Sequence, residues 1–187
     1  NHDAWRLNTP CENIVVRNCI IKAGHTLLGI GSELAGVVRN IYMTNCEASG
    51  KVHRLFFVKT NHRRGAFVEL VYMDSLRSTN APPAAEIYTD VLYQWRDLVP
   101  TYKDTLTRIN DIYLSNIEVD SANAIYEFRG DERLPIRNVV LRNIAVDCVK
   151  DTVNRAVNVE ALKVDNVTYN SVSSEILSDI DMFLGNK

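Results

Sequence analysis

Basic side chains crowd into one short stretch of an otherwise slightly acidic chain. The 187 residues carry 21 lysines and arginines against 23 aspartates and glutamates, a formal net charge of −2. Seven basic or imidazole side chains nevertheless lie within 14 residues: Lys51, His53, Arg54, Lys59, His62, Arg63 and Arg64. Arginine forks and lysine point charges bind carboxylates and sulfates. The stretch therefore predicts a site for an anionic ligand, and a merely solvated surface is the alternative.

Two further sets of side chains could join such a site. His25 follows Gly24 in a turn-like segment about one repeat before Lys59, and a structural role is the plainer alternative for a histidine in a turn. Four aromatic residues farther along could form a wall for sugar rings or a small core of their own: Tyr88, Tyr93, Trp95 and Tyr102. The sequence has neither Gly-x-Ser-x-Gly nor a Gly-Lys-Ser/Thr loop, which argues against a serine hydrolase of that type and a nucleotide-binding P-loop.

A repeated seven-residue phrase indicates how the chain positions these residues. The phrase is Asn-Ile-Val-Val-Arg-Asn-Cys at its first occurrence and Asn-Ile-Tyr-Met-Thr-Asn-Cys at its second. It occurs six times, with weaker matches after the second, starting at Asn13, Asn40, Leu70, Asp111, Asn138 and Ala161. The starts are 27, 30, 41, 27 and 23 residues apart. Repeats of this length indicate a solenoid or propeller, in which each unit buries its apolar face against its neighbours.

The pattern inside the phrase selects the type of solenoid. The second and fourth positions are always apolar, whereas the third and fifth are mostly polar, basic or tyrosine. Alternation with period two predicts β-strands with one face inward, and the runs are too short for helices. The asparagine at the sixth position predicts an inward turn with stacked amides. We therefore predict an all-β fold, a right-handed parallel β-helix of about six coils that rise about 4.8 Å each.

A second strand is expected in each coil after the phrase. The candidates are Leu28–Ser32, Leu55–Thr60, Glu86–Thr89, Asn123–Phe128 and Ala156–Val159. We expect residues 1–170 to form the β-helix, interrupted by a long loop at 78–108, and residues 171–187 to form a tail with helical spacing that caps the stack. Residues 1–12 read as a loop, which would leave the interior of the first coil uncovered.

The cysteines do not predict a disulfide framework or a zinc site. Cys11, Cys19, Cys46 and Cys148 are few and scattered, and no Cys-x-x-Cys occurs. Cys19 and Cys46 share one repeat position, so we expect them to stack in the core as free thiols, with a disulfide as the alternative. No metal or other cofactor is implied. The net charge gives no reason to expect nucleic acid or a membrane as a partner, and no apolar run has the length of a membrane span.

Several segments taken in order resemble glycoside hydrolase family 28, the polygalacturonases and related pectin hydrolases. They are Cys11–Cys19, Gly24-His25, Ile30–Glu33, Val38–Ile41, Lys59–Asn61, Leu134–Val139 and Asn143-Ile144. The resemblance covers nearly the whole chain up to about Asn170. It implies a right-handed parallel β-helix and inverting hydrolysis of galacturonosyl linkages in pectic polysaccharide.

The motifs of that family match this sequence only in part. They run in the order Asn-Thr-Asp, Asp-Asp, Gly-His-Gly and Arg-Ile-Lys. Gly24-His25 resembles the third with Thr26 in place of the last glycine, and Phe57-Val58-Lys59 resembles the fourth without its arginine. By this resemblance His25 would orient and tune the acid group, and Lys59 would hold a substrate carboxylate. The two aspartate motifs do not occur. Because inverting hydrolysis needs two carboxyl groups, the chain resembles the C-terminal half of such an enzyme, with its acids expected upstream.

The expected ligand is therefore a pectic or other uronic-acid polysaccharide. The substrate-binding candidates beside His25 are Gly24, Lys59, Arg54, Arg63, Arg64 and Tyr93. The expected protein partners are the missing N-terminal coils, or a second copy of the chain at the exposed first coil. The resemblance implies a secreted or periplasmic location. The alternatives are a non-catalytic β-helix that binds polysaccharide, which the changes at Thr26 and Phe57 favour, and an assembly module.

Overall fold

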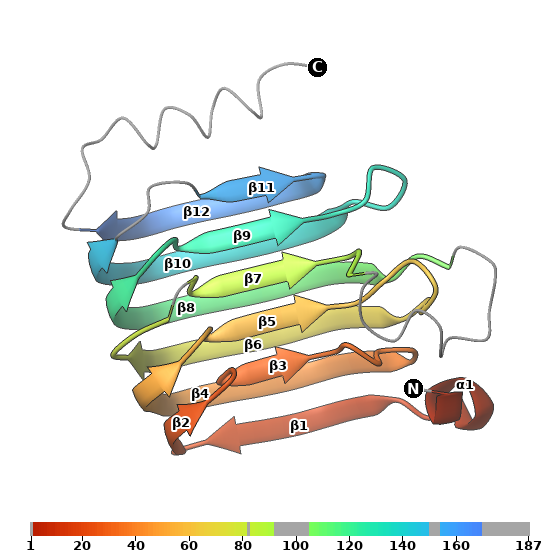
Figure 1. Ribbon diagram of the computed structural model, residues 1–187, viewed down its shortest axis with the longest axis horizontal. Coiled ribbons are helices and arrows are strands. Elements are labelled where there is room, and N and C mark those ends of the chain that lie inside the picture. The colour runs from red at the N-terminus through yellow and green to blue at the C-terminus, as the bar shows by residue number, and fades with distance from the viewer. Residues whose placement is uncertain (1, 82, 92–104, 150–153, 170–187) are drawn as a thin grey trace.

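The chain forms a parallel β-helix of six coils, in which two parallel sheets face each other across one core (Figure 1). This computed structural model describes residues 2–81, 83–91, 105–149 and 154–169. The first sheet runs in the order β1 (Cys11–Arg17), β4 (Val37–Val52), β6 (Phe67–Ser78), β8 (Arg108–Ala122), β10 (Ile136–Val149) and β12 (Val159–Tyr169), and β2 (Ile20–Gly24) also pairs with β4. The second sheet runs in the order β3 (Leu28–Ile30), β5 (Phe56–Lys59), β7 (Ala85–Tyr88), β9 (Tyr126–Arg129) and β11 (Arg155–Val157). All pairings between these strands are parallel.

The register of the first sheet aligns the repeated phrases position by position. The apolar second positions stack as Ile14, Ile41, Val71, Ile112, Val139 and Leu162. The fourth positions stack in the same way, from Val16 to Val164. This arrangement confirms the predicted fold class and number of coils. The strands of the second sheet also lie within two residues of the predicted ranges, or three at Asn123–Phe128.

The core is a narrow column of apolar side chains from both sheets. Val71, Ile112 and Val139 of the first sheet are fully buried, as is Phe128 of the second. Tyr126 stacks on Phe128 with ring centroids 5.2 Å apart, and burial raises the pKa of its hydroxyl to about 12. Burying a side chain of this size contributes on the order of 2 kcal/mol. Each coil therefore gains its stability mainly from the coils above and below it.

Asparagines at the bends form amide ladders, but on the outside of the molecule. Asn45 donates to Asn18 at 2.8 Å, and Asn143 and Asn166 continue the ladder from Asn116 at 2.9 Å each. Their φ angles are positive, between 51° and 57°, a conformation that asparagine tolerates better than most residues. The sequence correctly indicated stacked amides, but the expectation that they point inward is wrong. The bend directs these side chains to the surface, where they are exposed.

Two expectations for the first coil need correction. Residues 1–12 were expected to be a loop, whereas α1 spans His2–Leu7 and β1 starts at Cys11. Cys46 is buried, its thiol donates to the carbonyl of Thr44 at 3.3 Å, and burial raises its pKa. Cys19 itself is exposed, because it follows β1, an edge strand of the described first sheet. All four cysteines are free thiols.

The remaining predictions for the tail and for part of the long loop fall on residues outside the described part of the chain. These are the capping helix expected at 171–187 and the loop residues 92–104, which include Tyr93, Trp95 and Tyr102. Within the described residues, no helix is long and apolar enough to cross a membrane.

Candidate functional site

The outward side chains of the second sheet include acidic, basic and aromatic groups. In a strand, successive side chains point to opposite faces, so Phe56 and Val58 enter the core while Phe57 and Lys59 face out. The parallel register stacks these outward positions into two columns. The glutamate column is Phe57, Glu86, Glu127 and Arg155, and the lysine column is Lys59, Tyr88, Arg129 and Val157. Neighbouring members lie about 4.8 Å apart along the rod. Together with Arg54 and His25, the two columns are called the outer face below.

Cations and aromatic rings alternate along the lysine column. The guanidinium of Arg129 lies 4.7 Å from the ring centroid of Tyr88, and the Lys59 ammonium lies 5.5 Å from that of Phe57. The rings of Phe57 and Tyr88 meet edge to face at 6.3 Å. Burial lowers the pKa of Lys59, and the positive charge of Arg54 adds to that effect. Burial raises the pKa of Tyr88, helped by its hydrogen bond to Glu127. The column therefore presents fixed positive charges on a rigid aromatic support.

The two carboxylates of the glutamate column are already paired with arginines. Glu86 is almost fully buried, with 2% of its side chain exposed, and binds the guanidinium of Arg54. That guanidinium also lies 4.2 Å from the ring centroid of Phe57. One coil farther on, Glu127 binds Nη2 of Arg129, two residues later in the same strand. Within the described residues, both carboxylates of this column are therefore held in ion pairs with a guanidinium group.

His25 lies on the same side of the rod as Lys59. It precedes β3, and its ring centroid is 5.2 Å from that of His53, the equivalent residue one coil later. The backbone N–H of His53 donates to the carbonyl of His25 at 3.3 Å. Burial lowers the pKa of His25, and electrostatic interactions with Arg54, His53 and Lys59 lower it further. At neutral pH the imidazole is therefore uncharged and able to accept a proton or orient a polar group.

Two glycines lie near His25 and Lys59, and only one of them is required by close packing. A Cβ on Gly31 would lie 1.9 Å from the carbonyl oxygen of Lys59, and its φ is +119°. Gly31 therefore allows the chain to pass close behind the end of β5. Gly24 ends β2, and a Cβ there would meet only the Ile21 side chain at an ordinary 3.4 Å. The geometry gives no steric reason for glycine at this position.

The basic stretch of the sequence does not form one patch. Arg54 and Lys59 belong to the outer face, whereas Arg63 and Arg64 lie in the turn after β5. The backbone N–H of Arg63 donates to the Asn61 side chain at 3.0 Å. Arg64 is only 3% exposed, its guanidinium lies 6.0 Å from the Trp5 ring centroid, and burial lowers its pKa. Arg64 thus packs in the interior beside α1, with almost no surface for a ligand.

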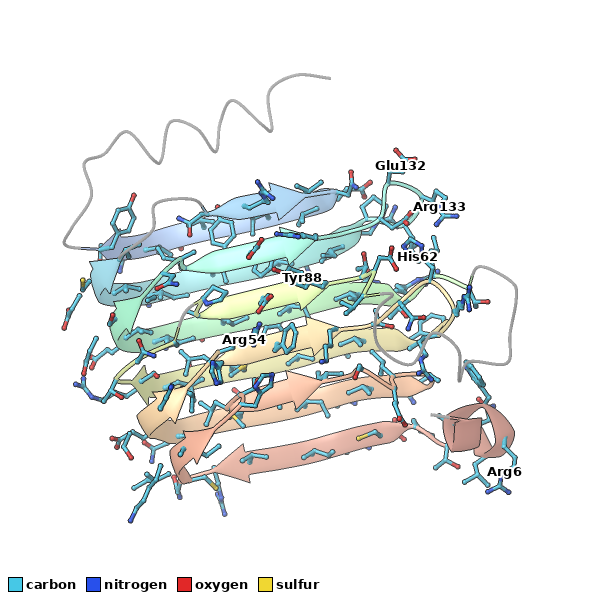
Figure 2. The ribbon with its side chains drawn as sticks, in the orientation of Figure 1. Arg6, Arg54, His62, Tyr88, Glu132 and Arg133 are labelled. Atoms are coloured by element: carbon cyan, nitrogen blue, oxygen red, sulfur yellow. The ribbon has the colours of Figure 1, made fainter. Side chains whose placement is uncertain are left out.

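His62 links the turns of three coils instead of joining the outer face. Its Nε2 lies 2.9 Å from an oxygen of Asp131, and its Nδ1 lies 3.9 Å from one of Asp90. Arg133 also binds Asp131, with its Nε 3.0 Å from the carboxylate. Figure 2 shows His62 and Arg133 at the ends of the strands, away from Arg54 and Tyr88. These contacts lower the pKa of Asp131, chiefly through Arg133.

Sequence reasoning placed only part of the outer face. It singled out His25, Arg54 and Lys59, which the structure brings together, while Tyr93 lies outside the described residues. It missed the roles of three charged residues, Glu86, Glu127 and Arg129. The available signal was positional, because Glu86-x-Tyr88 and Glu127-x-Arg129 repeat the spacing of Phe57-x-Lys59 in consecutive second strands.

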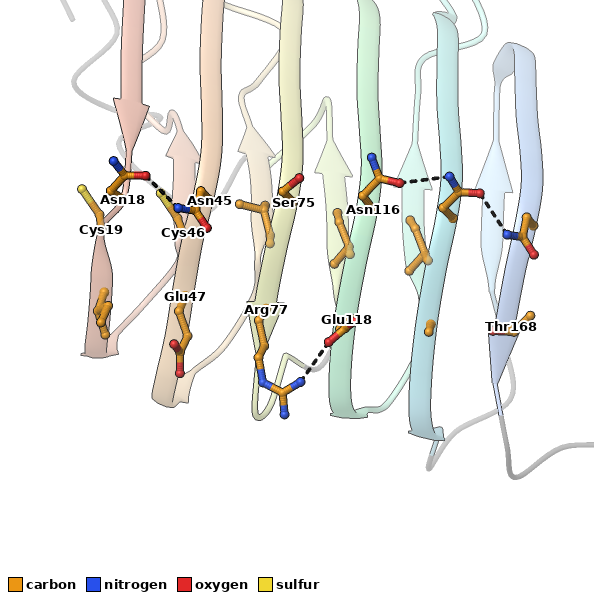
Figure 3. A pocket seen from close by; sticks show the side chains of 17 residues that line it. Asn18, Cys19, Asn45, Cys46, Glu47, Ser75, Arg77, Asn116, Glu118 and Thr168 are labelled. Carbon is orange, nitrogen blue, oxygen red and sulfur yellow. Dashed lines mark hydrogen bonds and ion pairs between the residues drawn. The ribbon is translucent and has the colours of Figure 1, made fainter.

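A groove runs along the exposed amide ladder of the first sheet, away from the outer face (Figure 3). This groove has a volume of about 830 Å³ and is lined by one amide or hydroxyl per coil from Asn18 to Asn166. On its other wall, Arg77 pairs with Glu118 at 3.0 Å. The ladder amides bond mainly to one another. Arg77 is the one lysine or arginine among the residues that line the described groove, so the groove offers little positive charge to an acidic ligand. Within the described residues, no cluster of three or more metal-binding side chains is found.

Comparison with known proteins identifies the fold. No protein-family model matches the sequence, and no curated protein matches it. The structure is similar to the crystal structure of a hyperthermoactive exopolygalacturonase from Thermotoga maritima, with a TM-score of 0.72 and 22% sequence identity. The match covers 90% of this chain, and the chain spans 36% of the length of that protein. The chain therefore has a polygalacturonase-like β-helix fold.

Proposed function

We propose that this chain is part of a polygalacturonase-like glycoside hydrolase that cleaves galacturonosyl linkages in pectic polysaccharide with inversion of configuration. In this proposal the outer face binds the acidic polysaccharide. Lys59 holds a substrate carboxylate, and the neutral His25 orients the acid group. The two catalytic carboxyl groups come from coils that this sequence does not contain, since neither aspartate motif occurs in it. By the resemblance to pectin hydrolases, the proposal expects a secreted or periplasmic protein.

The observation that supports this proposal most is the grouping of His25, Arg54 and Lys59 on one side of the rod. They come from two coils and lie 34 residues apart at most in the sequence, yet Arg54 and Lys59 both lower the pKa of His25, and Arg54 lowers the pKa of Lys59. A neutral imidazole beside a lysine that faces outward suits recognition of an acidic sugar next to a group that handles protons. The similarity of the fold to that of the exopolygalacturonase is consistent with this proposal.

A second candidate function is binding of polysaccharide without hydrolysis. The observation that favours it is the pairing of Glu86 with Arg54 and of Glu127 with Arg129. Inverting hydrolysis needs one carboxyl group that can donate a proton and another that activates water. Among the described residues of the outer face, both carboxylates are held in ion pairs. By itself, then, the chain is expected to bind and not to cleave.

Reducing-sugar release from polygalacturonate tests the proposal. The assay compares this chain alone with the chain joined to the sequence encoded upstream in its gene. The proposal expects release only from the joined protein, and binding of oligogalacturonate by both. Binding by both proteins without any release would instead support the non-catalytic alternative. No binding by either protein would contradict both functions.

A further inference from the structure

We propose that Arg129 forms a second carboxylate-binding position on the outer face, so that the face recognises a run of uronic-acid residues and not a single sugar. This inference rests on the proposed function, because it concerns the same face and the same class of ligand. Nothing in the sequence motifs points to Arg129. It follows from the register of the second sheet, which places Arg129 in one column with Lys59.

The spacing of the two cations sets the size of the ligand. Lys59 pairs with Tyr88 and Tyr88 pairs with Arg129, so the backbones of Lys59 and Arg129 lie two strands apart. Two strand spacings separate them by about 10 Å along the rod. A single uronic acid carries one carboxylate and engages one of these cations. A chain of uronic acids carries one carboxylate per sugar, so a chain that lies along the column can engage both.

The guanidinium of Arg129 is held in position and still accessible. It lies 4.7 Å from the Tyr88 ring centroid, and its Nη2 binds the carboxylate of Glu127. Half of the Arg129 side chain is exposed, compared with 21% for Arg54. Among the described residues, the contact with Glu127 uses only one of its three nitrogen atoms. The remaining donors of the planar fork can bind a carboxylate, and little side-chain freedom is lost because two contacts already fix the group.

Glu127 opposes the ligand at this position. Its carboxylate competes for the Arg129 guanidinium and repels an incoming carboxylate. One quarter of its side chain is exposed, so this repulsion acts close to the ligand. The two members of one ion pair are therefore predicted to have opposite effects on binding. A pair that serves stability alone would not show this difference in sign.

Isothermal titration calorimetry with galacturonate monomer, dimer, trimer and tetramer tests the proposal on the full chain. Arg129→Gln is expected to weaken tetramer binding on the order of tenfold and to flatten the rise in affinity with chain length. Glu127→Gln is expected to strengthen tetramer binding roughly two- to fivefold. The control pair is Arg142→Gln and Asp165→Asn, whose ion pair of 3.1 Å bridges β10 and β12 in the first sheet. Neither control is expected to change binding.

The outcomes separate this inference from the proposed function. If Arg129→Gln and Glu127→Gln change affinity in the same direction, or not at all, while Lys59→Gln weakens binding, the second position is wrong and the proposed function stands. If the wild-type chain binds none of the oligomers, the second carboxylate-binding position and the proposed function are both wrong. Should Arg129→Gln not fold, Arg129→Lys replaces it. That variant is expected to lose affinity severalfold because lysine cannot form the fork, and wild-type affinity would overturn the inference.

Discussion

Single residues on the outer face act through charges that are partly removed from water. The ammonium of Lys59 is flanked by the Phe57 ring and the Arg54 guanidinium, and both burial and that charge lower its pKa. A cation in this position gains when an anion arrives, because the anion offsets the repulsion from Arg54. The same argument explains why an uncharged His25 is compatible with the cluster.

Replacing Lys59 is the most direct test at this scale. Lys59→Ala is expected to weaken oligogalacturonate binding by about 1.5–3 kcal/mol at low salt, the usual contribution of a hydrogen bond to a charged group. The difference from wild type should shrink as salt is raised, because salt screens exposed charges. Calorimetric titrations at two salt concentrations measure both effects. Lys163→Ala on β12 provides the control, and unchanged binding by Lys59→Ala would remove the proposed role.

The sequence could reveal only part of the site at the residue scale. His25 and Lys59 stand out because each falls in a partial motif of a known family. Glu127 and Arg129 stand in no motif, and a short strand of four residues offers too few positions for its alternation to be read with certainty. Their place on the outer face becomes clear only when β9 is aligned with β7. The prediction that Arg64 binds substrate fails for a related reason. Its charge gave no sign that the side chain is buried beside Trp5.

Strands and turns are held in place by contacts between successive coils. His62, Asp90 and Asp131 tie together the turns after β5, β7 and β9. The carboxylate of Asp131 is 10% exposed and receives both His62 and Arg133. These turns follow the strands that carry Lys59, Tyr88 and Arg129, so their contacts support the end of the lysine column.

The link through Asp131 predicts a dependence of stability on pH. The pKa of Asp131 is lower in the folded chain than its value of about 3.9 in an unfolded one. It therefore contributes stability above that value, and the contribution is lost as the pH falls through the folded pKa. Asp131→Asn is expected to lower the free energy of unfolding at pH 7 by about 1–2 kcal/mol, with a smaller difference from wild type at pH 3.

Urea unfolding at the two pH values measures this effect. Asp120→Asn is the matched control, because its pair with Arg77 is more exposed, at 39% for the Asp120 side chain, and exposed pairs contribute little. An Asp131→Asn difference that does not decrease between pH 7 and pH 3 would contradict the assignment.

The external amide ladder makes a separate prediction about the bends. Asn143 donates to Asn116, accepts from Asn166 and has a φ of 51°. Asn143→Ala loses both hydrogen bonds and leaves a side chain with a Cβ in the left-handed region, so we expect a loss of about 1–2 kcal/mol. Asn143→Gly loses the same bonds but tolerates the backbone, so it should recover about 0.5–1 kcal/mol of that loss.

Thermal or urea unfolding of the two variants ranks them. Asp147→Ala, at an exposed position of the same strand, should stay within about 0.5 kcal/mol of wild type. Equal stability of the alanine and glycine variants would show that the backbone conformation at Asn143 carries no cost.

At the scale of elements, sequence reasoning succeeded where a signal repeats. The repeated phrase predicted the register of all six coils, because a position that is ambiguous in one copy is clear in the others. It could not tell that the amides face outward, since an asparagine in the left-handed region serves either side of a bend. It also missed α1, whose six residues are too few for a helical period to show.

At the scale of the whole molecule, the first coil exposes apolar side chains beside β1, an edge strand of the first sheet. Val15 and Ile20, in the first coil, are 66% and 64% exposed. Ile14 is 38% exposed, whereas its stacked equivalents Ile41 and Val71 are at most 4% exposed. An edge strand with such a surface offers unpaired backbone groups together with apolar area for another chain.

We expect the isolated chain to self-associate through β1. Sedimentation velocity over a range of concentrations should show species larger than the monomer, and the double variant Val15→Lys with Ile20→Lys should reduce them, since lysine protects edge strands. Arg137→Lys on β10 is a control that keeps its charge on the first sheet. A wild-type monomer at every concentration would contradict the prediction.

The unequal repeat lengths have a practical consequence. Every coil keeps the same register in the first sheet although the phrases start between 23 and 41 residues apart. Deleting one residue inside β6, such as Tyr72, would turn the residues that follow toward the opposite side. Foreign peptide grafted between Tyr88 and Arg108, within the longest repeat, would leave that alignment intact. The rod could then serve as a display scaffold that accepts an insertion between two coils.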